Sequence, residues 1–265
     1  MTDHDFALLD VPVAGVGVIT LNNPDRLNAW SGRIAERFWA RIDEARDRDD
    51  IRVVVITGAG RGFCPGADMD ALNQIRANPG GGSGAAVGSR RYSELIDYPK
   101  PVIAAINGAA AGVGLVLAMF CDIRFAASGA KFTTAFSRRG LIAEYGASWA
   151  LPRLVGLPRA LDLLLSGRVF TSDEAGEMGF VNAVIAPDQL MSHTLAYASD
   201  LAQNCSPTSW AVMKKQVYGD HAVSADEATS RSLPLMDASL KRADFQEGVQ
   251  SYLDKRPPNF APFSG

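Results

Sequence analysis

The chain has 265 residues, enough for one large domain with a substantial core, and 47% of its residues are hydrophobic while 21% are charged. A net charge of −3 provides no basic surface for nucleic acid, so the composition favours a small-molecule substrate. Three cysteines are too few for a disulfide framework, and the first residues lack the charged start and apolar core of a signal peptide, so we expect a cytoplasmic protein.

The first sixty residues predict a βαβ unit. Residues 16–21 have the pattern of a strand, and residues 53–57 form a continuously apolar strand that ends at Gly58. Between them, apolar residues at helical spacing mark the buried face of a helix: Ile34, Phe38, Ile42 and Ala45. Such a unit implies a parallel, buried pair of strands.

The winding continues to about residue 125. The predicted helices cover 70–77, a stretch that ends near Tyr98 and a small-residue stretch from Gly112, and the predicted strands cover 102–106 and 123–125. Residues 78–84 are so rich in glycine that we expect a mobile loop there. The apolar run 102–121 imitates a membrane span, but Asn107-Gly108 is a turn signal in its middle, so we expect a strand and a helix and no membrane partner.

Beyond residue 151 the pattern becomes mostly helical. Ser206-Pro207 is a good helix start, and amphipathic stretches follow at 211–217, 225–240 and 245–253. We therefore expect a core with the active site in residues 1–200 and a helical oligomerisation region in residues 201–265.

Two short stretches each have the pattern of a tight backbone turn that follows an apolar strand and precedes a helix. They are FCPGAD at residues 63–68 and NGAAAGVG at residues 107–114. Amide N–H groups exposed at two such turns can point at one developing negative oxygen, and Gly66, Gly112 and Gly114 allow the close approach this needs. The sequence therefore predicts an oxyanion hole. Cys64 is expected to be a buried, inert thiol, because no histidine is near it in the sequence.

Several further motifs occur in an order typical of one family. They are LNA at 27–29, TG at 57–58, KPVIAAING at 100–108, CDIR at 121–124, GLI at 140–142, LPRLVG at 151–156 and the closing stretch 247–260. With them, the chain resembles the crotonase, or enoyl-CoA hydratase/isomerase, superfamily along nearly its whole length.

The resemblance implies an α/β fold, a crotonase-like spiral of ββα units with a C-terminal helical trimerisation region. It also implies a homotrimer or a dimer of trimers, and a substrate that is an acyl thioester of coenzyme A. By their positions in the motifs, the amides of Ala67 and Val113 should hold the thioester oxygen. The same motifs assign coenzyme contacts to a second group of residues: Leu27, Ala29, Gly66, Asp68, Met69 and Gly112. We expect no permanently bound cofactor, and no metal-ligand spacing occurs.

The chain departs from the family pattern at two catalytic positions. Hydratases of the family use two glutamates, and the matching positions here carry Val116 and Phe136, which cannot transfer protons. Glu144 lies in a segment that resembles the one supplying the single catalytic glutamate of the peroxisomal-type 3-enoyl-CoA to 2-enoyl-CoA isomerases. Apolar neighbours should raise the pKa of Glu144 by desolvating it: Val116, Phe136, Ile142 and Trp149.

Other interpretations of these residues stay open. Glu144 could instead complement the dipole of a helix that begins near Gly146, and Asp68 could cap the helix that follows it. Arg138 and Arg139 could contact a substrate anion or simply be solvated. The resemblance at Glu144 implies an enzyme that shifts the double bond of a 3-enoyl-CoA to the 2-position through a thioester enolate. Two alternatives stay open: an enoyl-CoA hydratase or other acyl-CoA lyase or hydrolase, and a catalytically inactive acyl-CoA-binding protein.

Overall fold

The structure is a computed structural model that describes residues 5–77 and 90–263, so the predicted loop at 78–84 lies outside the described residues. Its larger sheet has the order β1-β2-β3-β5-β7-β10 within the described residues. The strands are β1 (Ala7–Val13), β2 (Gly15–Leu21), β3 (Ile51–Gly58), β5 (Val102–Ile106), β7 (Ile123–Ala127) and β10 (Ala183–Ile185). β1 and β2 pair antiparallel, and the other neighbours pair parallel. The parallel β2–β3 pair confirms the predicted βαβ unit.

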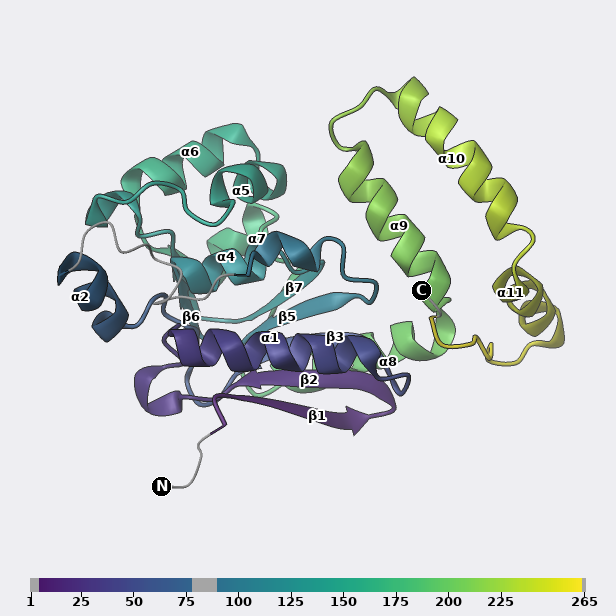
Figure 1. Ribbon diagram of the computed structural model, residues 1–265, viewed down its shortest axis with the longest axis horizontal. Helices are drawn as coiled ribbons and strands as arrows, with labels where there is room; N and C mark the ends of the chain where they lie inside the picture. Colours follow the sequence, from purple (N-terminus) through teal and green to yellow (C-terminus); the bar gives the residue numbers. More distant parts are fainter. Residues whose placement is uncertain (1–4, 78–89, 264–265) are drawn as a thin grey trace.

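Helices cover both faces of this sheet. Along β3, Val54 and Ile56 pack into the core beneath α1 (Gly32–Asp47), whereas Val53 and Val55 pack into a second core beneath α8 (Leu190–Asn204). Figure 1 shows α1 lying across one face of the sheet. A strand buried on both faces needs apolar residues at every position, which explains the continuous apolar run of β3.

A second, smaller sheet has the order β4-β6-β8-β9 within the described residues. Its strands are β4 (Gly62–Cys64), β6 (Ala109–Ala111), β8 (Lys131–Thr133) and β9 (Phe170–Thr171). The chain passes from β3 to β4, from β5 to β6 and from β7 to β8, so each unit contributes one strand to each sheet. β4 then leads into α2 (Met69–Ala77) and β6 into α4 (Val113–Met119). This is the expected spiral of ββα units.

The predicted helix that ends near Tyr98 is wrong at its end. The described residues there hold only a short 3-10 helix, η2 (Tyr92–Leu95). Tyr98 and Lys100 each precede a proline, which disfavours the helical backbone for both. Three helices follow Glu144 along the chain: α5 (Ala147–Val155), α6 (Leu157–Ser166) and α7 (Ser172–Glu177). α5 packs against α4 and α6, and α7 contacts β9 of the small sheet.

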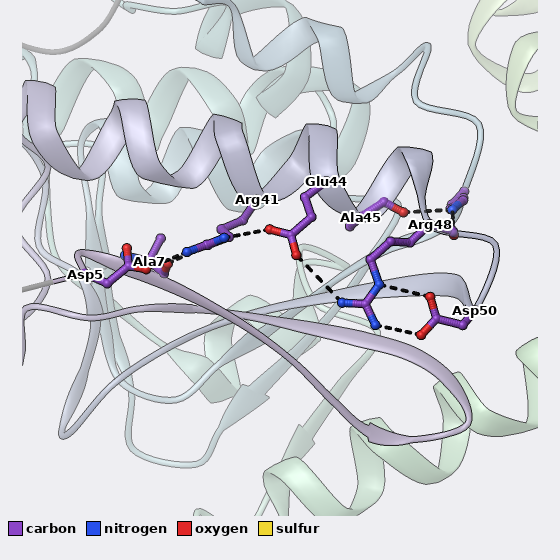
Figure 2. Close-up of polar contacts among 8 residues, drawn as sticks. Asp5, Ala7, Arg41, Glu44, Ala45, Arg48 and Asp50 are labelled. Carbon is purple, nitrogen blue, oxygen red and sulfur yellow. Dashed lines mark hydrogen bonds and ion pairs between the residues drawn. The ribbon is translucent and has the colours of Figure 1, made fainter.

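Polar contacts hold α1 at its middle and at its C-terminal end. From the middle of the helix, Arg41 donates through Nε to the carbonyl of Ala7 on β1, at 3.1 Å (Figure 2). At the C-terminal end, the Lys100 ammonium donates to the carbonyls of Ala45 and Arg48, at 2.7 and 2.8 Å. These carbonyls belong to the last turn of α1, so a buried cation completes the end of the helix. Burial lowers the pKa of Lys100 to about 8.

Three helices close the described chain: α9 (Pro207–Asp220), α10 (Ala225–Ser239) and α11 (Ala243–Asp254). They coincide with the three predicted amphipathic stretches, and Ser206 caps α9 by accepting from the Ser209 amide. α10 and α11 project to one side of the sheets (Figure 1). Lys214 on α9 anchors this region, because its ammonium pairs with Asp122 at 2.7 Å. Among the described helices, none is both long and apolar enough to span a membrane.

Candidate active site

A cavity of about 490 Å³ lies where the small sheet leads into α2 and α4. β4 and β6 are adjacent and parallel, so their carboxyl ends meet at one edge and the turns that follow them lie side by side. The cavity lining brings together all three residues predicted to be catalytic: Ala67, Val113 and Glu144. They come from three different ββα units and meet only in the folded chain.

The first turn exposes the Ala67 amide. Trp30 forms a parallel bridge with Ala67: its N–H donates to the Gly66 carbonyl at 2.7 Å, and its carbonyl accepts from the Asp68 amide at 2.8 Å. Because these two bonds flank Ala67, its own N–H points away from Trp30. Among the backbone hydrogen bonds of the described residues, the Ala67 N–H makes none. It is therefore available to an oxygen in the cavity.

Gly66 allows the two turns to approach each other. Its φ of +104° is a backbone conformation that residues with side chains rarely adopt, and a Cβ there would lie 3.0 Å from the carbonyl oxygen of Ala111. The close approach predicted for Gly66 therefore includes contact with the partner turn. Gly114 has a different role, because a Cβ on it would lie 2.3 Å from the Cys64 carbonyl oxygen. Gly114 is required for packing α4 against β4.

The second turn exposes the Val113 amide. Val113 is the first residue of α4, so its N–H has no carbonyl one turn earlier within the helix. The preceding Gly112 has φ +48° and donates to the Thr133 carbonyl on β8 at 3.1 Å, which holds the turn against the small sheet. The Val113 N–H and the positive end of the helix dipole both favour a negative oxygen at this point.

Glu144 lies in the turn that precedes α5. Tyr145 and Gly146 follow it with φ of +52° and +85°, and the Glu144 carbonyl accepts from the Ala147 amide at 2.9 Å. Its side chain is half-buried, and burial raises the pKa of the carboxyl above its ordinary value. Among the described residues, no side-chain hydrogen bond or ion pair involves this carboxylate, and no amide of α5 donates to it. A specific capping contact therefore does not support the alternative role at the start of α5.

Two other carboxylates line the cavity, and both are paired. Arg26 contacts Asp68 and Asp70, each at 2.8 Å. Asp68 also accepts from the Asp70 amide at 2.8 Å, and its carbonyl accepts from the Leu72 amide at 3.0 Å, so it caps α2 as the sequence suggested. Glu144 is thus the lining carboxylate without a described cation beside it. Arg26 was not predicted from the sequence, although it directly precedes the LNA motif.

The residues predicted to contact coenzyme A separate into two groups. Five of them line the cavity: Ala29, Gly66, Asp68, Met69 and Gly112. Leu27 does not; its side chain lies beside Gly62, where an added Cβ would be 3.2 Å from the Leu27 Cβ. A coenzyme contact by Leu27 therefore stays a prediction, and it would have to use the backbone.

The surroundings of Glu144 differ from those expected. Phe136 lines the cavity, as predicted, but three other expected neighbours do not. Val116 is fully buried within α4, Ile142 is 80% exposed, and Trp149 stacks on Phe120 with 6.3 Å between the ring centroids. The cavity is lined instead by two residues that were not predicted as neighbours of Glu144: Leu141 and Tyr145.

The two neighbouring arginines, Arg138 and Arg139, lie in different surroundings. Arg138 donates to the Ser166 carbonyl at 2.9 Å, whereas Arg139 lines the cavity.

Burial raises the pKa of the Cys64 thiol to about 12, so Cys64 is the inert thiol that was expected. No group of three or more histidine, cysteine, aspartate or glutamate residues within 5–77 and 90–263 is arranged to hold a metal ion.

Comparison with known proteins agrees with this geometry. A family model described as enoyl-CoA hydratase/isomerase matches residues 13–262. The chain is 36% identical over 251 residues to the 1,2-epoxyphenylacetyl-CoA isomerase of Escherichia coli K12, which covers 93% of this chain and 95% of that protein.

Solved structures of similar proteins share the fold. A probable enoyl-CoA hydratase/isomerase from Mycobacterium abscessus superposes with a TM-score of 0.86 at 31% identity, over 97% of this chain and 99% of that one. An enoyl-CoA hydratase from Mycobacterium marinum gives 0.71 at 49% identity, over 83% of this chain and 100% of that one. The motifs, the spiral of ββα units and these matches lead to one conclusion: the chain belongs to the enoyl-CoA hydratase/isomerase family.

Proposed function

We propose that this enzyme moves the double bond of a 3-enoyl-CoA to the 2-position, with Glu144 as its single acid and base. The observation that carries the proposal is the composition of the cavity. Two backbone amides that can hold one oxygen share it with one carboxylate that has no described cation beside it. The reaction needs one group to remove a proton and return it, and it releases and consumes no water.

The steps follow from this arrangement. The Glu144 carboxylate removes a proton from C2, and the electrons move through the thioester carbonyl to form a dienolate. The N–H groups of Ala67 and Val113 donate to the oxygen that becomes negative, which is stabilisation at the point where charge develops. Protonated Glu144 then returns the proton to C4, and the double bond lies between C2 and C3.

Partial burial suits Glu144 to this role. A general acid and base works best when its pKa is near the pH of the reaction, because both protonation states are then accessible. Burial raises the pKa of Glu144 from its ordinary value toward that range. Phe136, Leu141 and Tyr145 provide the apolar surface around the cavity.

Hydration of a 2-enoyl-CoA is the second candidate, since relatives of this chain are named enoyl-CoA hydratases. Val116 and Phe136 argue against the two-glutamate form of that reaction, because neither side chain can activate water or donate a proton. A hydratase built on Glu144 alone would have to use one carboxylate for both steps. The isomerase needs only one carboxylate, and Glu144 is the one lining carboxylate that has no described cation beside it.

We further propose that coenzyme A enters as part of the substrate and that the chain assembles as a homotrimer or a dimer of trimers through α9–α11. Apolar side chains are exposed on these helices, among them Val217, Tyr252 and Leu253, and burying them against a second copy would remove that surface from water. Light scattering on the purified protein measures the assembly, and a monomer at micromolar concentration would contradict this part of the proposal.

A panel of thioesters tests the reaction. The wild-type enzyme should isomerise 3-hexenoyl-CoA and should not hydrate crotonyl-CoA at a comparable rate. Glu144→Gln should lower kcat for isomerisation by roughly 10²- to 10⁴-fold, the usual contribution of a general acid and base. Glu177→Gln, the same change at an exposed position of α7 outside the cavity, is the control and should leave kcat unchanged.

Each other outcome of the panel removes part of the proposal. Near-normal isomerisation by Glu144→Gln would exclude Glu144 from the mechanism. Water addition without double-bond migration would favour the hydratase. Tight thioester binding without turnover would favour an inactive acyl-CoA-binding protein.

A further inference from the structure

A chain of aromatic rings connects the turn of Glu144 with the turn of Ala67. Tyr145 contacts Tyr92 edge to face, with 5.8 Å between the ring centroids and 67° between the planes. Tyr92 contacts Trp30 in the same way, at 5.6 Å and 69°. We call Tyr145, Tyr92 and Trp30 the aromatic relay. Tyr92 and Trp30 are buried, so their rings are enclosed by the core and have little room to move.

Each end of the relay is joined to a reacting group through the backbone. Tyr145 directly follows Glu144 in the sequence. Trp30 forms the parallel bridge with Ala67, and its two backbone hydrogen bonds determine where the Ala67 N–H points. The relay therefore joins the acid to one of the two oxyanion donors by contacts that do not pass through the substrate.

The backbone of the acid's turn needs such support. Tyr145 has φ +52°, a left-handed conformation that a side chain disfavours. Gly146 follows with φ +85°, and a Cβ there would lie 2.9 Å from the ring of Phe120. A residue with a side chain therefore does not fit at position 146 in this turn. A strained residue keeps its conformation only where the surrounding structure stabilises it. The contact of its ring with Tyr92 stabilises Tyr145 in this conformation.

We propose that Tyr145 and Tyr92 are positioning residues, whose ring contacts hold the Glu144 carboxylate at a fixed place relative to the Ala67 amide. The proposal rests on the function proposed above. The proposal assigns the effect to the edge-to-face contacts of the rings and gives the hydroxyl groups no part in it. Without the relay, the turn of Glu144 samples other conformations, the carboxylate gains contact with water, and proton transfer to and from the substrate slows.

Four variants test this inference. Tyr92→Leu and Tyr145→Leu remove one ring each, whereas Tyr92→Phe and Tyr145→Phe keep the ring and remove the hydroxyl. Phe170→Leu is the control, because Phe170 is equally buried and makes two edge contacts of the same kind, with Phe132 at 5.5 Å and Phe180 at 6.1 Å. Phe170 does not line the cavity.

The leucine variants should lower kcat for isomerisation by roughly tenfold, the factor that corresponds to the loss of one or two ring contacts. KM should change by less than about twofold, since the defect lies in placing the acid. The phenylalanine variants should keep kcat within about twofold of wild type. Phe170→Leu should lower the melting temperature as much as Tyr92→Leu does and leave kcat unchanged.

A second measurement does not depend on turnover. Infrared difference spectroscopy follows the titration of the Glu144 carboxyl, which is identified as the signal that Glu144→Gln removes. In the leucine variants its pKa should move back toward the ordinary glutamate value, because the carboxylate becomes more exposed, and in the phenylalanine variants it should stay raised. If Tyr92→Leu does not fold, Tyr145→Leu, at the partly exposed end of the relay, provides the same comparison.

The outcomes separate this inference from the proposed function. Wild-type kcat and an unchanged Glu144 pKa in both leucine variants would overturn the relay while leaving the isomerase intact. Equal losses of kcat in the phenylalanine and leucine variants would also overturn it, because a hydroxyl would then be responsible. A wild-type enzyme without isomerase activity would contradict the proposed function, and the titration would still decide whether the relay holds the carboxyl.

Discussion

Replacing Gly66 by alanine, beside a matched control, should distinguish a loss of catalysis at the oxyanion hole from a general loss of stability. The residue has φ +104°, so an alanine there is strained by about 1–3 kcal/mol. Its Cβ would also lie 3.0 Å from the Ala111 carbonyl oxygen, so one of the two turns must shift by a few tenths of an ångström. The shift separates the amides of Ala67 and Val113, which must meet at one oxygen.

The expected effect on catalysis follows from the value of one such donor. Losing one oxyanion-hole donor typically lowers kcat by about 10²- to 10³-fold, or about 2.7–4 kcal/mol of barrier. The assay is steady-state isomerisation of 3-hexenoyl-CoA by Gly66→Ala, together with the free energy of unfolding in urea. Gly129→Ala is the matched control, because Gly129 has φ +79° and no atom within 4 Å of an added Cβ.

Both variants should lose about 1–3 kcal/mol of stability, since both place alanine at positive φ, and Gly66→Ala should lose the larger amount because its Cβ also contacts Ala111. Only Gly66→Ala should lose catalysis. If Gly66→Ala keeps kcat within about threefold of Gly129→Ala, the two turns do not form the oxyanion hole, because displacing one donor should weaken stabilisation of the transition state.

Three further predictions concern ionisation and packing. The acidic limb of kcat/KM should have its midpoint above the ordinary glutamate value of 4.5, because Glu144 must lose its proton to act as a base and burial raises its pKa. Glu144→Gln should leave the stability of the fold unchanged below pH 4.5, stabilise it increasingly between 4.5 and that midpoint, and stabilise it fully above the midpoint, which melts at several pH values can check. Ser172→Ala should raise the free energy of unfolding by about 1 kcal/mol, because the buried Ser172 hydroxyl has no hydrogen-bond partner within the described chain, and a destabilised variant would count against this. Ellman's reagent should titrate at most one thiol per native chain and three after denaturation. Burial raises the pKa of Cys64 and of Cys121 to about 12, whereas Cys205 is partly accessible.

The long elements of the fold could be predicted because their signals are local. β3 is apolar at consecutive positions since both of its faces are buried, and α1 repeats apolar residues at helical spacing. The strands of the small sheet were not predicted, because three residues are too few to show a period of two. β1 was missed for another reason: it is an edge strand that includes Asp10 and Pro12, residues typical of turns.

The site was predictable in part. The small residues of the two turns indicated amide donors, and the family motifs indicated which amides these are. Arg26 was not predicted, since its contacts with Asp68 and Asp70 join residues more than forty positions apart. Unless those contacts are known, the three carboxylates that line the cavity cannot be told apart by charge, so charge gives no reason to choose Glu144 as the catalytic acid and base. Tyr92 was missed in the same way, because a buried tyrosine looks like any other core aromatic.

What the sequence determined by itself is the set of parts: apolar strands, glycine turns that expose amides, and a glutamate where the family pattern allows a single acid. Tertiary structure alone decided which parts meet. Parallel pairing of β4 with β6 brings the two turns together, Arg26 forms ion pairs with two of the three carboxylates, and Tyr92 joins the turn of Glu144 to Trp30. The two kinds of signal act over different distances along the chain. Backbone preference and periodicity act over a few residues, whereas charge pairing and ring packing act between groups that only the folded chain brings within a few ångströms of each other.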